Sequence, residues 1–435
     1  MDNLTRKRKK DLQLGELIAI ALGGMVGGGI FSILGISTEI IGNATPIAII
    51  IGGILAFFAA YSYVKLALLY KDEGATYSFF KKTFPNSKLF ASIIGWLIVF
   101  GYISTLALYS FTFSSYFCSQ FAIINHPLWQ KIMAGVIISI FSIINLVSVK
   151  GMGQIEDVLV YSKIIILLFI SGLLAGKGDI QNLCPVFESQ STLMNILIVS
   201  AITFVSYEGF QLVIHAYNEM DEPHKNIPKA IYISIGIATL LYVTLAISAL
   251  SVIPKEAIIA DKEYALAAGA KKYLGGFGQF IVIFGALLAT SSAISGTLFG
   301  ASRLMAVIAN DGYFPKTLGS KIKTYIPHKA IITMSLLAFI LLATGGLEVI
   351  LEFGSITFII VSLLMAFSNY KKRKETNSSA LFTISAVVGL LVAALLIVYF
   401  EFTENKEQFM YILIIYILLG IGATLYSKKN KNIAQ

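Results

Sequence analysis

The sequence has 435 residues, of which 57% are apolar and only 13% are charged. Soluble domains carry about 25% charged residues, so this composition excludes an ordinary water-soluble protein and indicates an integral membrane protein. The net charge of +9 at pH 7 could indicate a nucleic-acid partner. The placement of the basic residues, taken up below, argues instead for a lipid bilayer and against nucleic acid.

Apolar runs long enough to cross a bilayer recur along the whole chain, since about 20 helical residues suffice. We therefore predict an all-α integral membrane protein with about twelve transmembrane helices and no sizeable aqueous domain. The predicted spans are residues 15–41, 45–66, 88–121, 129–149, 156–175, 193–217, 229–252, 275–308, 329–346, 348–370, 380–400 and 409–427.

The basic residues predict the orientation of these spans. If the N-terminus is cytoplasmic, 24 of the 33 Lys and Arg residues fall in cytoplasmic segments and seven in outer segments. This asymmetry follows the positive-inside rule and predicts a multi-pass protein of the cell membrane with both termini in the cytoplasm. The first apolar run is too long for a cleavable signal peptide.

The cysteines and histidines indicate no redox or metal centre. Cys118 and Cys184 both fall near the predicted outer side, where they could form a disulfide, although two separate thiols are favoured. The four histidines have no ligand spacing, so we expect no metal and no cofactor. Because no nucleophile–base pair is evident, we do not expect an enzyme.

The middle of the first span contains three consecutive glycines, Gly27, Gly28 and Gly29. Glycine weakens a helix and frees backbone groups, which hydrocarbon tolerates only where they line a cavity or bind something. Free N–H groups at the start of the second half-helix would suit a carboxylate. Helix packing is the alternative, since Gly23 and Gly27 have small-xxx-small spacing.

A second interruption is predicted in the sixth span, where Glu208 stands beside Gly209. Matching interruptions in the first helices of two five-span halves indicate an inverted repeat with a binding site at mid-membrane. Carbonyls freed from Ser206 to Gly209 would accept an ammonium group. Phe204 and Tyr207 could shield the ligand as gates, or could simply pack against lipid or the core.

Two of the charged residues inside predicted spans are candidates for function, Glu208 and Lys163. Glu208 could select a cationic side chain, carry a proton or pair with a lysine, because intramembrane carboxylates are costly and usually functional. Lys163 lies about 10 Å into its helix, where it could snorkel or could remain buried and gain and lose a proton. The hydroxyls of Ser291 and Ser292 could bind an ion or a lysine, or could cap carbonyls of their own helix.

Further motifs accompany these residues: Ile30-Phe31 after the glycine run, Glu73 to Tyr77 after the second span, Tyr207 to Phe210 in the sixth, and Asp311-Gly312 after the eighth. Together they resemble the amino acid–polyamine–organocation (APC) superfamily, in particular its proton-coupled amino acid permeases. The sequence departs from that pattern at Ala75, where glycine is common, and at Glu208, where the residue is usually apolar.

The resemblance implies a LeuT-like fold of two inverted five-helix repeats plus two C-terminal helices, with helices 1 and 6 broken. The corresponding divisions are a basic N-terminus at 1–14, repeats at 15–175 and 176–370, and the last two helices and C-terminus at 371–435. It also implies a substrate with an amine and a carboxylate, held at the positions Gly27, Gly28, Gly29, Ile30, Phe204, Ser206, Tyr207, Glu208 and Gly209.

Lys163 resembles a lysine of an archaeal proton-coupled member, in which the amine takes the place of a sodium ion. By that resemblance it would reach the carbonyl of Gly23 and the hydroxyls of Ser291 and Ser292. Some exchangers in the superfamily carry a similar lysine, so this residue argues against sodium more than it establishes proton coupling.

We therefore expect a secondary active transporter that imports amino acids by alternating access, coupled to protons and independent of sodium. The alternatives are an exchanger of amino acids or polyamines and a non-transporting amino acid sensor on the same scaffold. The sequence does not determine which amino acid is bound, whether neutral or cationic substrates are preferred, or the oligomeric state.

Overall fold

The computed structural model describes residues 12–121, 127–147, 152–320 and 326–431. The α-helices are α1 (Leu14–Met25), α2 (Gly29–Ile41), α3 (Thr45–Tyr70), α4 (Ala75–Thr83), α5 (Lys88–Cys118), α6 (Pro127–Val147), α7 (Met152–Ala175), α8 (Leu193–Thr203), α9 (Pro223–Val252), α10 (Lys255–Asp261), α11 (Ala265–Asn310), α12 (His328–Lys371), α13 (Ala380–Glu404) and α14 (Lys406–Lys431). Short 3-10 helices are η1 (Gly42–Ala44), η2 (Ser119–Phe121), η3 (Ile180–Leu183), η4 (Phe204–Tyr207), η5 (Phe210–Ala216), η6 (Lys262–Tyr264) and η7 (Lys316–Gly319).

This nearly all-helical architecture confirms the predicted fold class. Among the described residues, extended pairing is limited to one bridge between Leu12 and Met220, and ten helical stretches are apolar and long enough to cross a membrane. The stretch Gly29–Tyr70 joins α2 and α3. Helix α12 covers both spans predicted at 329–346 and 348–370, so the total of twelve stays a prediction.

Two long helices change direction at a glycine. Gly275 in α11 and Gly346 in α12 both have φ +73°, a conformation that favours glycine. A Cβ atom at either position would meet no atom within 4 Å. The backbone conformation, rather than lack of space, therefore accounts for glycine at these two kinks. The kink at Gly346 falls where we predicted one span to end and the next to begin.

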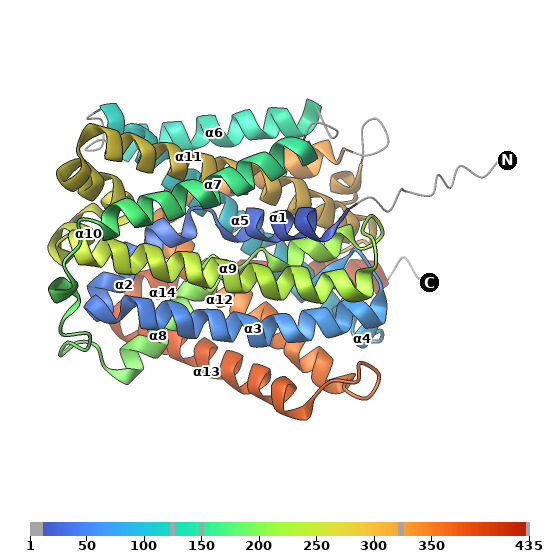
Figure 1. The fold of residues 1–435 in the computed structure, drawn as a ribbon. Coiled ribbons are helices and arrows are strands. Elements are labelled where there is room, and N and C mark those ends of the chain that lie inside the picture. Colours follow the sequence, from blue (N-terminus) through green and yellow to red (C-terminus); the bar gives the residue numbers. More distant parts are fainter. Residues whose placement is uncertain (1–11, 122–126, 148–151, 321–325, 432–435) are drawn as a thin grey trace.

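The helices lie side by side as a bundle (Figure 1). One end of the bundle, which we call the termini end, carries the start of α1, the short helix α4 and the connection from α12 to α13. The opposite end, which we call the far end, carries α10 and the segment between α7 and α8. Helices α3 and α9 run together across the face shown in Figure 1 and pack against each other.

Burial separates central helices from peripheral ones. In the stretch Leu193–Ala216, 94% of the most apolar window is buried, and in α5 72% is buried. The corresponding shares are 28% in α13 and 17% in α14. The interrupted sixth segment is therefore at the centre of the bundle, whereas α13 and α14 present apolar side chains on the outside, where a bilayer would solvate them.

Candidate functional site

The first membrane segment leaves the helical conformation at the glycine run. Helix α1 ends at Met25, Val26 follows with φ −84° and ψ 78°, and α2 begins at Gly29. An α-helix leaves its last four carbonyls and its first four N–H groups without partners inside the helix. Both sets of backbone groups are thus released in the middle of the bundle.

The sixth segment opens at the corresponding place. Helix α8 ends at Thr203 and continues as η4, after which Glu208 is extended, with φ −69° and ψ 134°. Gly209 has φ +130°, and the chain then resumes as η5. The α-helical hydrogen bonding therefore stops before the four residues of η4, so that backbone N–H and C=O groups lose their α-helical partners there.

The two openings touch each other. A Cβ atom on Gly209 would lie 2.4 Å from the carbonyl carbon of Gly24 and 2.6 Å from the nitrogen of Met25. The hydroxyl of Tyr242, from α9, lies 2.7 Å from the Met25 carbonyl oxygen and 3.0 Å from that of Ser206. Tyr242 therefore donates its proton between the two openings and holds their carbonyl ends together.

The three glycines of the run pack closely against neighbouring helices. A Cβ atom would lie 2.7 Å from the Tyr109 ring at Gly27, 2.6 Å from the Thr112 hydroxyl at Gly28 and 2.5 Å from the Ser206 hydroxyl at Gly29. Close helix packing therefore explains why these three positions cannot carry a side chain. The first turn of α2, which includes the buried Ile30, has no side-chain cap, and its N–H groups have no partner within the helix.

Buried oxygens without partners lie in the sixth segment. The Ser206 hydroxyl and Oε1 of Glu208 are buried and form no hydrogen bond, although Glu208 is only 2% exposed. The other oxygen of Glu208 accepts a hydrogen bond from Gln211 Nε2 at 2.6 Å. The same nitrogen donates to the hydroxyl of Tyr102, from α5, at 3.1 Å. An unpaired carboxylate oxygen at this depth favours a cationic or proton-donating partner.

Lys163 is fully buried in α7, and its Nζ atom donates to the Gly23 carbonyl oxygen at 3.1 Å and to Ser292 Oγ at 3.3 Å. The amine therefore stays inside the bundle instead of snorkelling to its surface. It links α7 to the last turn of α1 and to α11. Ser291, the other predicted hydroxyl, is only partly buried at the neighbouring position of α11.

The two predicted gate residues differ in their surroundings. Tyr207 is fully buried, donates its hydroxyl proton to the Ile49 carbonyl oxygen of α3 at 2.7 Å and packs its ring 5.5 Å from that of Tyr242. Tyr207 is therefore anchored towards α3. Phe204 is fully buried at the start of η4.

Residues that the sequence did not single out complete the site. Tyr109 donates to the Gly24 carbonyl oxygen at 2.8 Å, and Tyr242 bridges Met25 and Ser206. Both tyrosines sit in long apolar runs with no motif around them, so no sequence signal separates them from core aromatics. Gln211 could have been suspected, because it is the amide side chain nearest to Glu208 in the sequence, and it donates to Glu208 across the non-helical Gly209.

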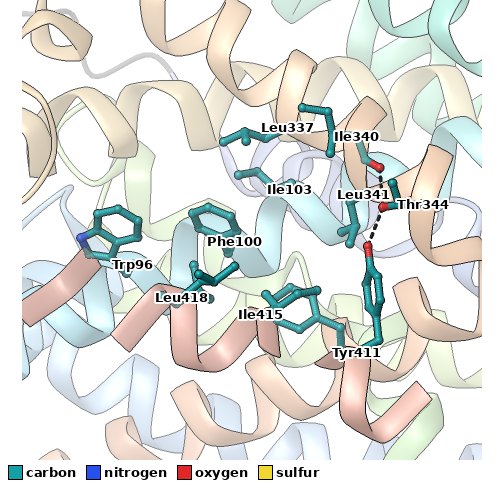
Figure 2. Close-up of a pocket in the computed structure, with 12 residues that line it drawn as sticks. Trp96, Phe100, Ile103, Leu337, Ile340, Leu341, Thr344, Tyr411, Ile415 and Leu418 are labelled. Carbon is teal, nitrogen blue, oxygen red and sulfur yellow. Dashed lines mark hydrogen bonds between the residues drawn. The ribbon is translucent and has the colours of Figure 1, made fainter. Parts of the chain in front are cut away.

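A pocket elsewhere in the bundle does not have the chemistry for a zwitterion. It has a volume of about 250 Å³ and lies between α5, α12 and α14, as Figure 2 shows. Apolar side chains such as Phe100, Leu341 and Ile415 form most of its wall, and hydroxyls of Thr344 and Tyr411 lie at one edge. None of the residues lining this pocket carries a charge.

No group of three or more His, Cys, Asp or Glu residues within the described chain could hold a metal ion. Cys118 is buried, Cys184 is exposed, and both are free thiols. The interpretation as two separate thiols agrees with this arrangement.

Comparison with known proteins fits this geometry. The sequence profile of the amino acid permease family matches residues 12–423. The chain belongs to the amino acid permease family. The family and the transporters related to this chain support amino acid transport as its activity, in a multi-pass membrane protein.

Three relatives show how far the similarity extends. An uncharacterized protein of Methanocaldococcus jannaschii is 31% identical, over 98% of this chain and 97% of its own. The inner membrane transport protein YbaT of Escherichia coli is 27% identical, over 98% of each chain. The human cystine/glutamate transporter is 27% identical, over 85% of this chain and 74% of its own.

Proposed function

We propose that this protein imports amino acids by alternating access, coupled to protons and independent of sodium. The observation that carries the proposal is the contact between the two opened segments, with Lys163 bonded to the end of one of them. The first repeat (15–175) and the second (176–370) each contribute one opened segment, and the remaining region, 371–435, contains the two outer helices α13 and α14.

The substrate carboxylate is assigned to the N-terminal end of α2, at Gly28, Gly29 and Ile30, where free N–H groups and the helix dipole favour an anion. The ammonium group is assigned to the second lone pair of the Ser206 carbonyl and to the unpartnered Ser206 hydroxyl. Phe204 would cover the bound substrate from the α8 side.

Lys163 is assigned the coupling role. As an ammonium it donates to the Gly23 carbonyl and Ser292, and it fills a position where a cation stabilises the released carbonyl end of α1. Loss of its proton would weaken these bonds and loosen α1 from α7 and α11. A proton taken up at one side of the membrane and released at the other would thereby drive the change between the two states.

Uptake into proteoliposomes with an imposed pH gradient tests this assignment. Lys163→Ala should bind the substrate and remain folded, but should lose gradient-driven accumulation. Lys177→Ala, an exposed lysine just beyond the same helix, is the matched control and should accumulate substrate like the wild type. Full accumulation by Lys163→Ala would overturn the coupling role.

An obligatory exchanger is the second candidate, because the human cystine/glutamate transporter is among the relatives. A counter-flow assay distinguishes an obligatory exchanger from a proton-coupled importer. An exchanger takes up labelled amino acid only when the vesicles contain unlabelled substrate, whereas a proton-coupled importer also fills empty vesicles when a pH gradient is present.

We also propose that the termini end faces the cytoplasm in the cell membrane, on the basis of the basic residues gathered there. The thiols provide a direct test, because Cys184 is exposed near the far end and Cys118 is buried. A membrane-impermeant thiol reagent should label Cys184 in intact cells, and Cys184→Ser should abolish labelling. If Cys184 is labelled only after the cells are broken open, the far end faces the cytoplasm and the proposed orientation is wrong.

A further inference from the structure

Two carboxyl groups meet inside the bundle, away from the opened segments. Glu352 in α12 is 6% exposed and Glu401 in α13 is fully buried. Helices α12 and α13 pack against each other, and the two carboxyl groups are close enough to interact electrostatically. We refer to them as the carboxyl pair. They lie on helices that contribute nothing to the candidate site described above.

The carboxyl pair has no basic partner in the described chain. Both oxygens of Glu401 and Oε2 of Glu352 lack a partner at hydrogen-bond geometry, although the Asn405 side chain lies near Glu401. No lysine or arginine described in the structure forms an ion pair with either residue. On the same helix, one turn before Glu352, Glu348 has its own partners: Lys262 Nζ at 2.7 Å and Gln408 Nε2 at 2.7 Å.

The helices packed against the carboxyl pair supply no cation either. Helix α8 carries no charged residue, and the one charge on α3, Lys65, donates to the Asn377 carbonyl oxygen at 3.1 Å. The other charged groups of the surrounding elements include Lys81 and Lys82 of α4, Lys88 of α5, Lys131 of α6, Glu263 of η6, Lys271, Lys272 and Arg303 of α11, Glu404 of α13, and Lys406 and Glu407 of α14, and the tyrosines of α14 are Tyr411 and Tyr416. Lys131 donates to the Ala343 carbonyl oxygen, and Tyr411 and Tyr416 bond to threonine hydroxyls.

Two neighbouring carboxylates cannot both remain ionised at this depth, because their charges repel each other and burial removes most of their hydration. An ionised carboxylate only accepts hydrogen bonds, whereas a protonated carboxyl group also donates one. Contact between the two groups is therefore favourable only when one cation, at its smallest a proton, lies between them. A metal ion would need further ligands, and no group of three or more His, Cys, Asp or Glu side chains within the described residues could supply them.

We propose that Glu352 and Glu401 form a second ion-binding site, which holds one proton shared between the two carboxyl groups. The proton would enter from the far end, through a polar vestibule of about 370 Å³ lined by Lys262, Glu263, Glu348 and Gln408. Glu352 follows Glu348 by one helical turn, so it lies just beneath this vestibule. The site does not depend on the role assigned to Lys163.

The position of the carboxyl pair connects it to the sixth segment. The Ser104 hydroxyl of α5 donates to the Ile350 carbonyl oxygen at 2.6 Å, and the Ser355 hydroxyl donates to the Ile202 carbonyl oxygen of α8 at 2.8 Å. Glu352 lies between Ile350 and Ser355, and Ile202 immediately precedes the end of α8. Loss of the shared proton would leave two carboxylates that repel each other and push α12 and α13 apart. This movement would strain the Ser104–Ile350 and Ser355–Ile202 hydrogen bonds.

Thermal unfolding of the purified full-length protein as a function of pH tests the proposal. From about pH 4.3, the ordinary pKa of a glutamate, to about pH 9, the pKa that full burial can give one, the apparent Tm of the wild type should fall, because the native state keeps a proton that the unfolded state has lost. Glu401→Gln replaces the shared proton with an amide donor to Glu352, so its decline should be smaller. The matched control Glu404→Gln, an exposed residue of the same helix, should follow the wild type.

If the Tm of Glu401→Gln falls with rising pH as much as the Tm of the wild type does, the proposal is overturned. If Glu401→Gln does not fold, Glu352→Gln provides the reciprocal amide. Infrared spectroscopy of the wild type gives a readout independent of any variant: a protonated-carboxyl band at neutral pH that disappears on alkalinisation is the expected result, and absence of such a band contradicts the shared proton. Stabilisation by added sodium chloride at fixed pH, with no effect of pH, would assign the site to a metal cation instead.

Discussion

Replacing Gly209 by alanine should separate the two opened segments. The backbone at Gly209 has φ +130°, where a side chain costs about 1–3 kcal/mol. The added Cβ atom would also stand 2.4 to 2.8 Å from the backbone of Gly24 and Met25, whereas carbon atoms pack at about 3.5–4.0 Å. Backbone cannot rotate away as a side chain can, so the segments must move apart by about 1 Å, at a further cost of about 1–3 kcal/mol.

We therefore expect Gly209→Ala to lose about 2–6 kcal/mol of unfolding free energy and to lose substrate binding. The matched control is Gly236→Ala on the outside of α9, where a Cβ atom meets nothing within 4 Å. Alanine in that helical position should stabilise the protein by up to about 1 kcal/mol. The two substitutions add the same methyl group, but the first should lower the unfolding free energy and the second should raise it.

The assay is thermal unfolding in detergent, with and without the amino acid that stabilises the wild type most. Saturating ligand at about 100 times its Kd adds about 2.7 kcal/mol to the native state, so binding is read from the same curve. A Gly209→Ala protein as stable as the wild type, and stabilised as much by the amino acid, would refute the close contact between the opened segments.

Three further results are expected. Tyr242→Phe leaves the Met25 and Ser206 carbonyls without their shared donor and should cost about 1–3 kcal/mol of stability, whereas Tyr399→Phe on the exposed face of α13 should cost nothing measurable. If Glu208 selects a cationic side chain, Glu208→Gln should lower the ratio of arginine to alanine uptake by about tenfold or more, and an unchanged ratio in transport assays excludes that role. At Asp72, burial raises the pKa, but the Lys82 ammonium, the Gly74 N–H group and the Ser78 hydroxyl outweigh it and hold the pKa below its usual value. Asp72 therefore stabilises the folded state above about pH 4 and loses that contribution as the pH falls through its lowered pKa, so acid unfolding of Asp72→Asn should lack this step.

The sequence predicted the class of fold and the places where the first and sixth segments open, because both depend on local backbone chemistry. Three consecutive glycines, and a carboxylate beside a glycine, each weaken an apolar helix at that point. The boundary predicted between the spans 329–346 and 348–370, from the length of the apolar runs alone, coincides with the kink at Gly346. Helix α4 and helix α10 were not predicted, since each is a short amphipathic or polar segment outside the apolar runs.

The sequence could not show which side chains complete the site. Tyr242 and Tyr109 bond to carbonyls of α1 only because α9 and α5 pack against it, and that contact is a property of the tertiary arrangement. The carboxyl pair was missed for a similar reason. Glu352 is one acid in an apolar run, and Glu401 fell just outside the predicted span 380–400, so their contact becomes visible only when α12 and α13 are placed together.

Structure determination with the bound amino acid, chosen as the one that raises the Tm most, tests the central claim most directly. We predict density between α2 and η4, with the carboxylate on the N–H groups of Gly28 to Ile30 and the ammonium within hydrogen-bonding distance of the Ser206 carbonyl. Density in the apolar pocket of Figure 2, or at any place not bounded by both opened segments, would contradict the account.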